Sequence, residues 1–172
     1  MDSFLELAKA RYSVRKYKPA AVEQEKIDRI LEAARVAPTA CNNQPQKIYI
    51  IKSEEKRKAL AEVCPCTFDA PVIFAVGFDE NLAAKGKLRE NYNYGETDAA
   101  IVCSHMMFEA AELGLGSCWV GWFNSNDVKR VLGLPDSVVV CNLLPVGYPS
   151  ESAKPSHLHG ERRELSEIAE EI

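Results

Sequence analysis

The sequence lacks the short motifs that mark the commonest nucleotide-binding and hydrolytic sites. Neither Gly-x-Gly-x-x-Gly nor Gly-x(4)-Gly-Lys-Ser/Thr occurs among its 172 residues, which removes the usual sequence evidence for a Rossmann or P-loop site. Gly-x-Ser-x-Gly is absent as well, and nothing else marks a hydrolase nucleophile.

The chain also lacks an excess of positive charge and any long apolar run. Its 21 Lys and Arg residues stand against 25 Asp and Glu residues, so bulk nucleic acid and anionic membranes are poor electrostatic partners. The longest apolar runs are far shorter than a membrane span, and the first residues lack the apolar core of a signal peptide. We expect a cytoplasmic protein with no nucleic-acid or membrane partner, in which a local basic cluster holds any anionic ligand.

The six cysteines form no pattern that is typical of a metal site or a disulfide scaffold. Cys64-Pro-Cys66 could be combined with His157 and His159, but no second cysteine pair stands at matching spacing, which is a poor zinc signature. A chain of this length, rich in core residues, does not need disulfides. We expect reduced thiols and no metal.

Predicted strands and helices alternate along the chain, which indicates an α/β or α+β fold around a central sheet. A capping box at Ser3 and Glu6 predicts a first helix that reaches Tyr12. The predicted strands cover 47–52, 71–78, 117–123 and 137–149; the other predicted helices cover 22–37, the residues after Ser53, 97–113, the residues between Ser125 and Gly133, and the residues from Glu164. The polar stretch 81–94 is expected to be a short helix or a loop. Residues 1–172 are expected to form one domain.

Two features of this pattern point to an interface between subunits. The predicted helix over 97–113 is apolar nearly all round, as expected of a helix buried inside the fold or between subunits. The tail over 150–172 has too little apolar content to form a domain, and we expect it to pack on the main body or on a partner subunit.

Three polar side chains alternate at the end of the first predicted helix: Arg11, Ser13 and Arg15. They could converge on one anion, because arginine forks match phosphate geometry and a serine hydroxyl adds a neutral hydrogen bond. The alternative interpretation is a basic helix end whose positive charges interact favourably with the negative end of the helix dipole. Arg162 and Arg163 are by default a solvated pair, and they matter only if the tail folds back toward Arg11 and Arg15.

Two further segments could contact a flat, neutral ligand. In the stretch 37–45, amide side chains such as Asn42 and Gln44 offer donors and acceptors for the edge of a heterocycle, although a polar turn explains them equally well. Gly121 stands between two tryptophans and permits close backbone approach to a ring, although a core strand is equally reasonable. His105 is expected to be a satisfied interior histidine rather than a catalyst.

Taken together, these motifs resemble those of the flavin-dependent nitroreductase family, from the first predicted helix to the last. Family members tend to open with Arg-x-Ser-x-Arg and an aromatic residue, and then carry Ala-Pro-Ser-x-x-Asn-x-Gln-Pro-Trp. A long buried helix that begins near an Asp and closes on Gly-Leu-Gly follows, and then a Gly-Tyr-Pro and a basic pair. The corresponding residues here are Arg11, Ser13, Arg15 and Tyr17; Ala37 to Gln46; Asp98 with Gly114 to Gly116; Gly147 to Pro149; and Arg162 with Arg163.

The resemblance implies an α+β fold with a central mixed, mostly antiparallel sheet flanked by helices, in an entwined homodimer with FMN at two interface sites. It implies that the FMN phosphate and ribityl chain are bound by Arg11, Ser13, Arg15, Arg162 and Arg163. The other subunit would supply Pro38, Thr39 and Ala40, with Asn42 and Gln44 near the flavin. The backbone of Val120, Gly121 and Trp122 would lie against the ring. No side chain is assigned as a catalytic acid or base.

The implied activity is hydride transfer from NADH or NADPH to flavin N5, followed by reduction of a nitroaromatic, quinone or similar acceptor in a second half-reaction. A specialised flavoenzyme on the same fold, such as a dehydrogenase or dehalogenase, is one alternative. A non-enzymatic flavin-binding or redox-sensing module that uses the cysteines is another. Thr39 replaces the family's usual serine, Gln46 replaces its usual tryptophan, and the chain lacks the long helical insertion with which larger members cover the substrate.

Overall fold

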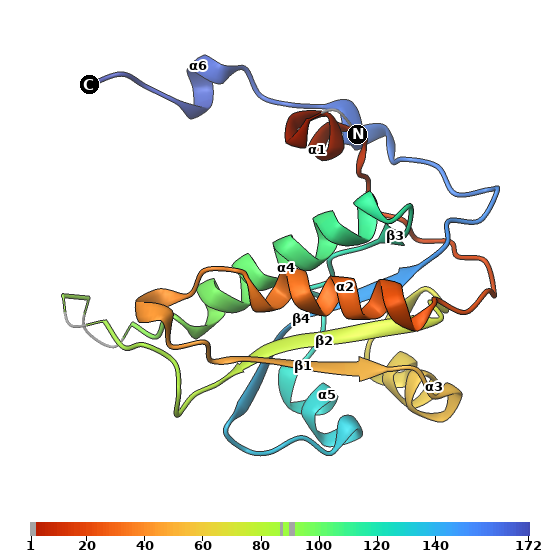
Figure 1. The fold of residues 1–172 in the computed structure, drawn as a ribbon, viewed down its shortest axis with the longest axis horizontal. Coiled ribbons are helices and arrows are strands. Elements are labelled where there is room, and N and C mark those ends of the chain that lie inside the picture. The colour runs from red at the N-terminus through yellow and green to blue at the C-terminus, as the bar shows by residue number, and fades with distance from the viewer. Residues whose placement is uncertain (1–2, 87, 90–91) are drawn as a thin grey trace.

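The computed structural model describes residues 3–86, 88–89 and 92–172 (Figure 1). The helices are α1 (Phe4–Ala10), α2 (Gln24–Arg35), α3 (Glu54–Val63), α4 (Gly95–Glu112), α5 (Ser125–Leu132) and α6 (Leu165–Ile168). The strands are β1 (Gln46–Ile51), β2 (Val72–Asp79), β3 (Gly116–Ser117) and β4 (Val138–Gly147). Three 3-10 turns complete the order: η1 (Ala40–Asn42), η2 (Pro65–Thr67) and η3 (His157–Gly160).

The four strands form one sheet in the order β1-β2-β4-β3, and each neighbouring pair is antiparallel. Within the described ranges, the one parallel pairing is an isolated bridge between Ser13 and Ser117, so the predicted mixed sheet is mixed only at that point. The helices lie on both faces of this sheet, and the α+β class is therefore confirmed (Figure 1).

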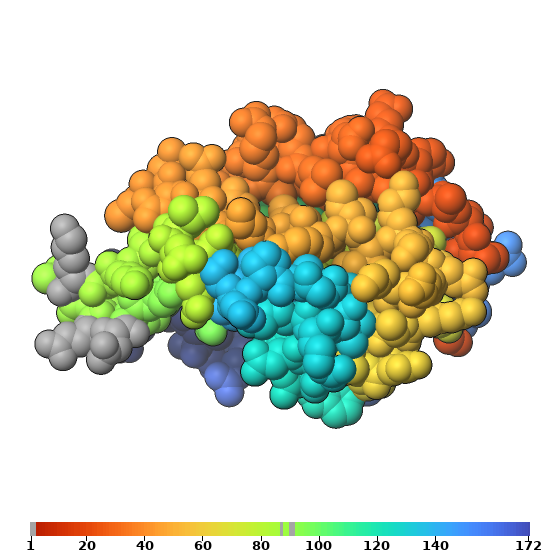
Figure 2. Space-filling view, turned by 90° about the horizontal axis from the view of Figure 1, so that it is seen from below, coloured from red at the N-terminus to blue at the C-terminus, as the bar shows by residue number. Residues whose placement is uncertain are grey.

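The core consists of two apolar layers, one on each face of the sheet. Helices α2 and α4 cover one face, where Phe74 and Leu144 are fully buried. Helices α3 and α5 cover the other face, seen from below in Figure 2, where Ile73 and Leu143 are buried. Neighbouring residues of a strand point to opposite faces, so β2 is buried along almost its whole length, as its unbroken apolar run predicts. Each fully buried side chain of this size contributes roughly 1.5–3 kcal/mol.

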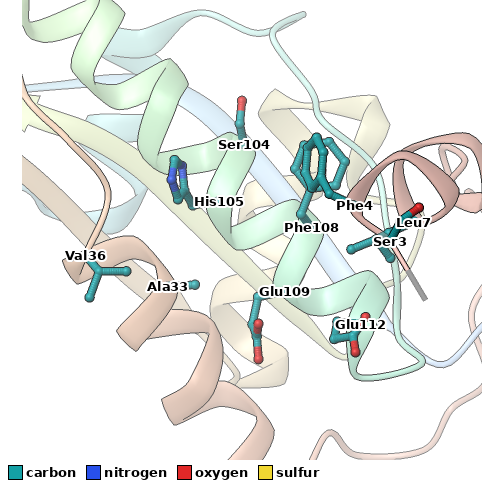
Figure 3. Close-up of a pocket in the computed structure, with 10 residues that line it drawn as sticks. All are labelled: Ser3, Phe4, Leu7, Ala33, Val36, Ser104, His105, Phe108, Glu109 and Glu112. Atoms are coloured by element: carbon teal, nitrogen blue, oxygen red, sulfur yellow. The ribbon is translucent and has the colours of Figure 1, made fainter. Parts of the chain in front are cut away.

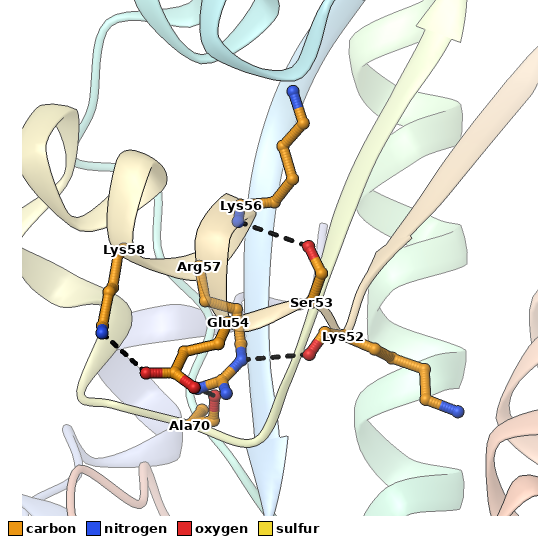
Figure 4. Close-up of polar contacts among 7 residues, drawn as sticks. All are labelled: Lys52, Ser53, Glu54, Lys56, Arg57, Lys58 and Ala70. Atoms are coloured by element: carbon orange, nitrogen blue, oxygen red, sulfur yellow. Dashed lines mark hydrogen bonds and ion pairs between the residues drawn. The ribbon is translucent and has the colours of Figure 1, made fainter.

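Of the predicted helix caps, those of α1 and α3 are confirmed, and that of α5 is wrong. The Ser3 hydroxyl accepts from the Glu6 N–H in α1, and the Ser53 hydroxyl accepts from the Lys56 N–H in α3 (Figure 4). The cap of α5 is Asn124 rather than Ser125. Ser125 instead accepts a hydrogen bond of 3.2 Å from the Val140 N–H and thereby ties α5 to β4.

Three expected elements are shorter than predicted. The first helix ends at Ala10, so Tyr12 lies beyond it. The strand expected over 117–123 is reduced to β3 and one bridge between Val120 and Leu143, because the chain turns away from β4 after that bridge. The terminal helix is the single turn α6. Of the stretch 81–94, residues 87, 90 and 91 lie outside the described part, and its described residues form turns and bridges rather than a helix.

The tail over 150–172 leaves the sheet and runs past α1 (Figure 1). His159 Nε2 lies 3.1 Å from the Lys9 carbonyl oxygen, and the His159 ring meets the edge of Tyr12. From Glu161 to the end, every residue is exposed, including Leu165 and Ile168. Beyond η3 the tail thus has no buried apolar side chain within its own chain.

Two further findings concern the described residues alone. No helix among them has the length and apolarity that crossing a membrane requires. They also contain no group of three or more His, Cys, Asp or Glu side chains placed to hold a metal ion, and all six cysteines are free thiols.

Candidate functional site

The segment from Arg11 to Tyr17 is fixed against the end of the sheet. The Val14 N–H donates to the Ser117 carbonyl oxygen at 2.9 Å, and the Val14 side chain is 2% exposed. The Tyr17 hydroxyl lies 2.8 Å from the Val14 carbonyl oxygen and 3.1 Å from that of Pro145, and burial raises the pKa of this hydroxyl far above its ordinary value. Because side chains alternate along an extended segment, the inward Val14 directs its two neighbours to the opposite side.

Arg11, Ser13 and Arg15 gather around one thiol. Burial raises the pKa of Cys118, while the nearby positive charges of Arg15 and Arg11 and a hydrogen bond with Ser13 oppose that rise. One thiol therefore lies within the influence of all three predicted side chains. The cleft that Arg11 lines includes neither Ser13 nor Arg15, so their convergence on one anion stays a prediction.

Two buried polar atoms at this end of the molecule make no hydrogen bond to any described residue. They are the Arg11 Nε and the Ser117 Oγ. Both residues line a cleft of about 180 Å³ between α1, the end of α4 and β3. A buried donor without a partner costs about 1–3 kcal/mol, and an anion that accepts from the guanidinium would remove that cost.

The tail approaches the same end of the molecule. Arg162 donates to the carbonyl oxygens of His159 at 2.7 Å and Glu161 at 2.6 Å, and His159 contacts Lys9 and Tyr12. The tail therefore folds back beside Tyr12, the residue that follows Arg11. Arg162 and Arg163 can contribute to an anion site only when the tail folds back in this direction. Arg162 and Arg163 are both exposed there.

The backbone of the loop over 38–45 adopts a conformation that its sequence does not predict. Cys41, Asn42 and Gln44 have φ values of 55°, 54° and 50°, in the left-handed region, although none of them is glycine. Such residues cost of order 1–3 kcal/mol each and persist only where surrounding contacts hold them. The sequence motif predicts a loop at this position. Among the three residues, only Asn42 indicates a left-handed conformation, because asparagine tolerates it better than most residues.

Side chains hold this loop in place. Asp98 Oδ1 accepts from the Ala40 N–H at 2.8 Å, and Thr39 Oγ1 accepts from the Gln44 N–H at 3.1 Å. Asn43 Nδ2 donates to the Leu82 carbonyl oxygen at 3.0 Å. Sequence reasoning placed Asp98 only as a marker of the helix start and missed its contact with the loop.

The segment from Val120 to Trp122 leaves the sheet beside a polar cleft. Val120 exchanges two backbone hydrogen bonds of 2.9 Å with Leu143, whereas the Trp122 side chain is 76% exposed. A Cβ added to Gly121 would meet nothing within 4 Å, so packing inside the chain does not require this glycine. The cleft measures about 350 Å³ and includes Gly121, Glu96 and the β4 residues 139–142. The core-strand alternative is therefore wrong for Trp122.

The two halves of the predicted site lie at opposite ends of α4. The loop contacts Asp98 in the first turn of the helix, whereas Val14 contacts Ser117 just beyond its last turn (Figure 1). At about 1.5 Å per residue, the helix separates Asp98 from Gly114 by roughly 24 Å. The loop and the arginine cluster of one chain therefore do not enclose the same small ligand.

A largely apolar groove lies on the outer side of α4, between α1 and α2 (Figure 3). It measures about 520 Å³, and Phe4, Val36 and Phe108 contribute to its walls. Phe4 is 67% exposed although its ring packs edge-on against Phe108. His105 has the expected hydrogen-bond partner, with Nδ1 2.9 Å from the Ile101 carbonyl oxygen, but it is half-buried at the wall of the groove and the expected interior position is wrong.

The chain is similar in sequence and fold to known proteins. A nitroreductase family protein of known structure from Clostridium difficile 630 is 37% identical, covers 98% of this chain and 97% of its own, and superposes with a TM-score of 0.90. An FMN-dependent nitroreductase from Clostridium difficile R20291 is 28% identical over 90% of this chain and 92% of its own, with a TM-score of 0.76. An FMN reductase [NAD(P)H] from Bacillus subtilis strain 168 is 29% identical, across 85% of this chain and 66% of its own.

The sequence model of one family matches the chain over residues 8–68 and 64–148. These ranges include the arginine cluster, the left-handed loop, α4 and β4. The chain belongs to the nitroreductase family.

Proposed function

We propose that this protein is an FMN-dependent oxidoreductase that takes hydride from NADH or NADPH. The observation that carries the proposal is the buried Arg11 Nε, which has no protein acceptor among the described residues and belongs to a side chain that lines the cleft beside β3. An acidic chain holds an anion only through such a local cluster. The cluster fits the phosphate of FMN, and the relatives named for FMN support that choice.

The residues divide into groups that would hold different parts of FMN. Arg11, Ser13 and Arg15 bind the phosphate and ribityl chain, and Arg162 and Arg163 join them from the tail. The backbone of Val120, Gly121 and Trp122 lies against the ring, where the open space beside Gly121 allows close approach. When bound, FMN supplies the hydride chemistry, while these residues bind and orient it.

The proposed unit is a homodimer, because one chain separates the two halves of the site. A second copy whose α4 runs antiparallel to the first would place its loop, with Pro38, Thr39 and Ala40, beside the arginine cluster of its partner. Asn42 and Gln44 would then approach the flavin. The groove in Figure 3 runs along the C-terminal half of α4, from Ser104 to Glu112, and would form part of such a contact. In this arrangement residues 1–172 act as one domain, and the exposed tail over 150–172 packs on the partner.

A substitution in the groove tests the homodimer. Phe108→Glu should convert the protein to monomers in sedimentation velocity, because it places a charge on the proposed contact. Ile50→Glu is the matched control, since Ile50 is exposed on β1, away from the groove. A wild-type protein that sediments as a monomer would contradict the proposed dimer.

The proposed reaction has two half-reactions at one site. The nicotinamide binds first and leaves after hydride transfer, and a nitroaromatic, quinone or similar small acceptor then takes its place. Relatives named as nitroreductases and FMN reductases support this acceptor class. A thiol-based sensor that uses Cys118 or Cys141 is less consistent with the structure, because burial raises the pKa of both thiols, that of Cys141 to about 12. Reactive thiols have depressed pKa values.

Spectroscopy of the purified protein tests the proposal. We expect a flavin absorption spectrum that bleaches on anaerobic addition of NADH or NADPH and returns when a quinone or nitroaromatic is added. Parallel-line steady-state kinetics would support the alternating half-reactions. A colourless protein that neither binds added FMN nor oxidises either nicotinamide in its presence would overturn the proposal.

A further inference from the structure

Asp98 is a buried carboxylate whose position is tied to the loop over 38–45. It lies in the first turn of α4 and is 1% exposed. Its Oδ1 accepts the Ala40 N–H at 2.8 Å, and its Oδ2 is buried without a hydrogen bond to any described residue. One oxygen of this carboxylate therefore serves the loop alone.

The other three side-chain contacts of the loop lie in exposed surroundings. These are the bond from the Gln44 N–H to Thr39, the bond from Asn43 to the Leu82 carbonyl oxygen, and the bond from the Gln44 side chain to the Asn42 carbonyl oxygen. Water competes with exposed hydrogen bonds and competes much less with one that ends on a buried charged acceptor. Of the four contacts, the one to Asp98 therefore contributes most to holding the loop.

The backbone of the loop needs such a contact. Ala40 directly precedes Cys41 and Asn42, two of the residues with left-handed φ values. Without a fixed point at Ala40, these residues would relax toward ordinary φ values, because non-glycine residues favour them. A buried carboxylate is itself unfavourable, but the amide dipoles at the start of α4 favour a negative charge there.

We propose that Asp98 is a positioning residue for cofactor binding: its carboxylate fixes the Ala40 N–H and thereby the left-handed loop that covers the flavin of the partner subunit. The inference rests on the proposed function, since it assigns the loop to that flavin. Asp98 does not itself touch the cofactor in this account. It acts through Ala40, and its effect is on the shape of the loop.

Substitutions of Asp98 separate the hydrogen bond from the charge. Asp98→Asn keeps an oxygen that can accept from Ala40, and FMN affinity measured by fluorescence titration should fall by no more than about threefold. Asp98→Ala removes the acceptor and should weaken FMN binding by about tenfold or more. Asp127→Ala is the matched control, because Asp127 lies in the first turn of α5 and pairs only with Arg130 among the described residues; it should leave the affinity unchanged.

Two results of these titrations would overturn the proposal. One is an Asp98→Ala variant that binds FMN as tightly as the wild type. The other is an Asp98→Asn variant as weak as Asp98→Ala, which would show that the charge matters and the hydrogen bond does not. If the wild type itself binds no FMN, the proposed function fails, and the following measurement on the apoprotein still decides whether Asp98 fixes the loop.

Hydrogen exchange of the apoprotein measures the loop directly. Asp98→Ala should speed exchange of the Ala40 amide by about tenfold or more, and Asp98→Asn should change it far less. Ala40→Pro removes the donor instead; the extended Thr39, with φ −134° and ψ 156°, is compatible with a following proline. If both variants act through one bond, their effects on FMN affinity will not add. Unchanged exchange in Asp98→Ala, or fully additive effects, would contradict the proposal.

Discussion

The two halves of the site are held in place by different means. The segment from Arg11 to Tyr17 is fixed by backbone pairing with Ser117 and by the buried Val14, and its polar side chains remain available for a ligand. The loop over 38–45 has a left-handed backbone that depends on a distant side chain, Asp98. In the first half of the site, we expect the largest effects from substitutions that remove a ligand contact. In the second half, we expect the largest effects from substitutions that change the backbone.

The largest expected effect is the loss of a ligand contact in the first half. Arg11→Ala should weaken FMN binding by about 1.5–3 kcal/mol, roughly 10- to 150-fold, because it removes charged hydrogen bonds to the phosphate. Fluorescence titration gives the affinity. Arg130→Ala is the matched control, since Arg130 lies on α5 and forms an exposed ion pair with Asp127. Equal effects of the two substitutions would place the phosphate elsewhere.

A smaller effect is expected where the first half is attached to the core. Tyr17→Phe removes the hydroxyl that lies within hydrogen-bond distance of the Val14 and Pro145 carbonyl oxygens. The free energy of unfolding should fall by about 1–2 kcal/mol, because the Val14 carbonyl oxygen loses this donor, whereas the Pro145 carbonyl oxygen keeps the Cys118 N–H. Chemical denaturation measures this change. Tyr49→Phe is the control, since Tyr49 makes no side-chain hydrogen bond within the described residues, and an equal loss there would contradict the anchoring role.

The smallest expected effect has the opposite sign and lies in the second half. Cys41→Gly should raise the free energy of unfolding by about 0.5–1 kcal/mol, because glycine adopts a φ of 55° without the strain of a side chain. Ala40→Gly is the control; Ala40 has no positive φ, so this change should lower stability by about 0.5–1 kcal/mol. Thermal melts of the apoproteins compare the two. Destabilisation by both would show that the loop is not strained at Cys41.

The sequence predicts the first half of the site better than the second, for physical reasons. Alternating polar residues around the apolar Val14 predict an alternation of buried and ligand-binding side chains, and the structure shows Val14 buried. The left-handed conformation of Cys41 and Gln44 has no such signal, because neither residue type favours it. It is imposed by Asp98, which is far away in sequence and recognisable only once the chain is folded.

The fold shows the same division between local and distant causes. The unbroken apolar run of β2 and the serine caps of α1 and α3 depend on neighbours in the sequence, and they are confirmed. The cap of α5 and the end of β3 are decided by tertiary contacts. The Ser125 hydroxyl accepts a hydrogen bond from the Val140 N–H, and the chain leaves the sheet after Val120. Periodicity within one segment carries no information about either contact.

The central claim is that each flavin site combines the arginine cluster of one chain with the loop of another. A heterodimer of one Arg11→Ala chain and one Asp98→Ala chain, purified with two different tags, tests this claim most directly. One of its sites would carry both substitutions and the other neither, so FMN titration should find one site of wild-type affinity per heterodimer, although each variant homodimer binds weakly at both sites. A heterodimer without a tight site would show that both halves act within one chain and would contradict the account.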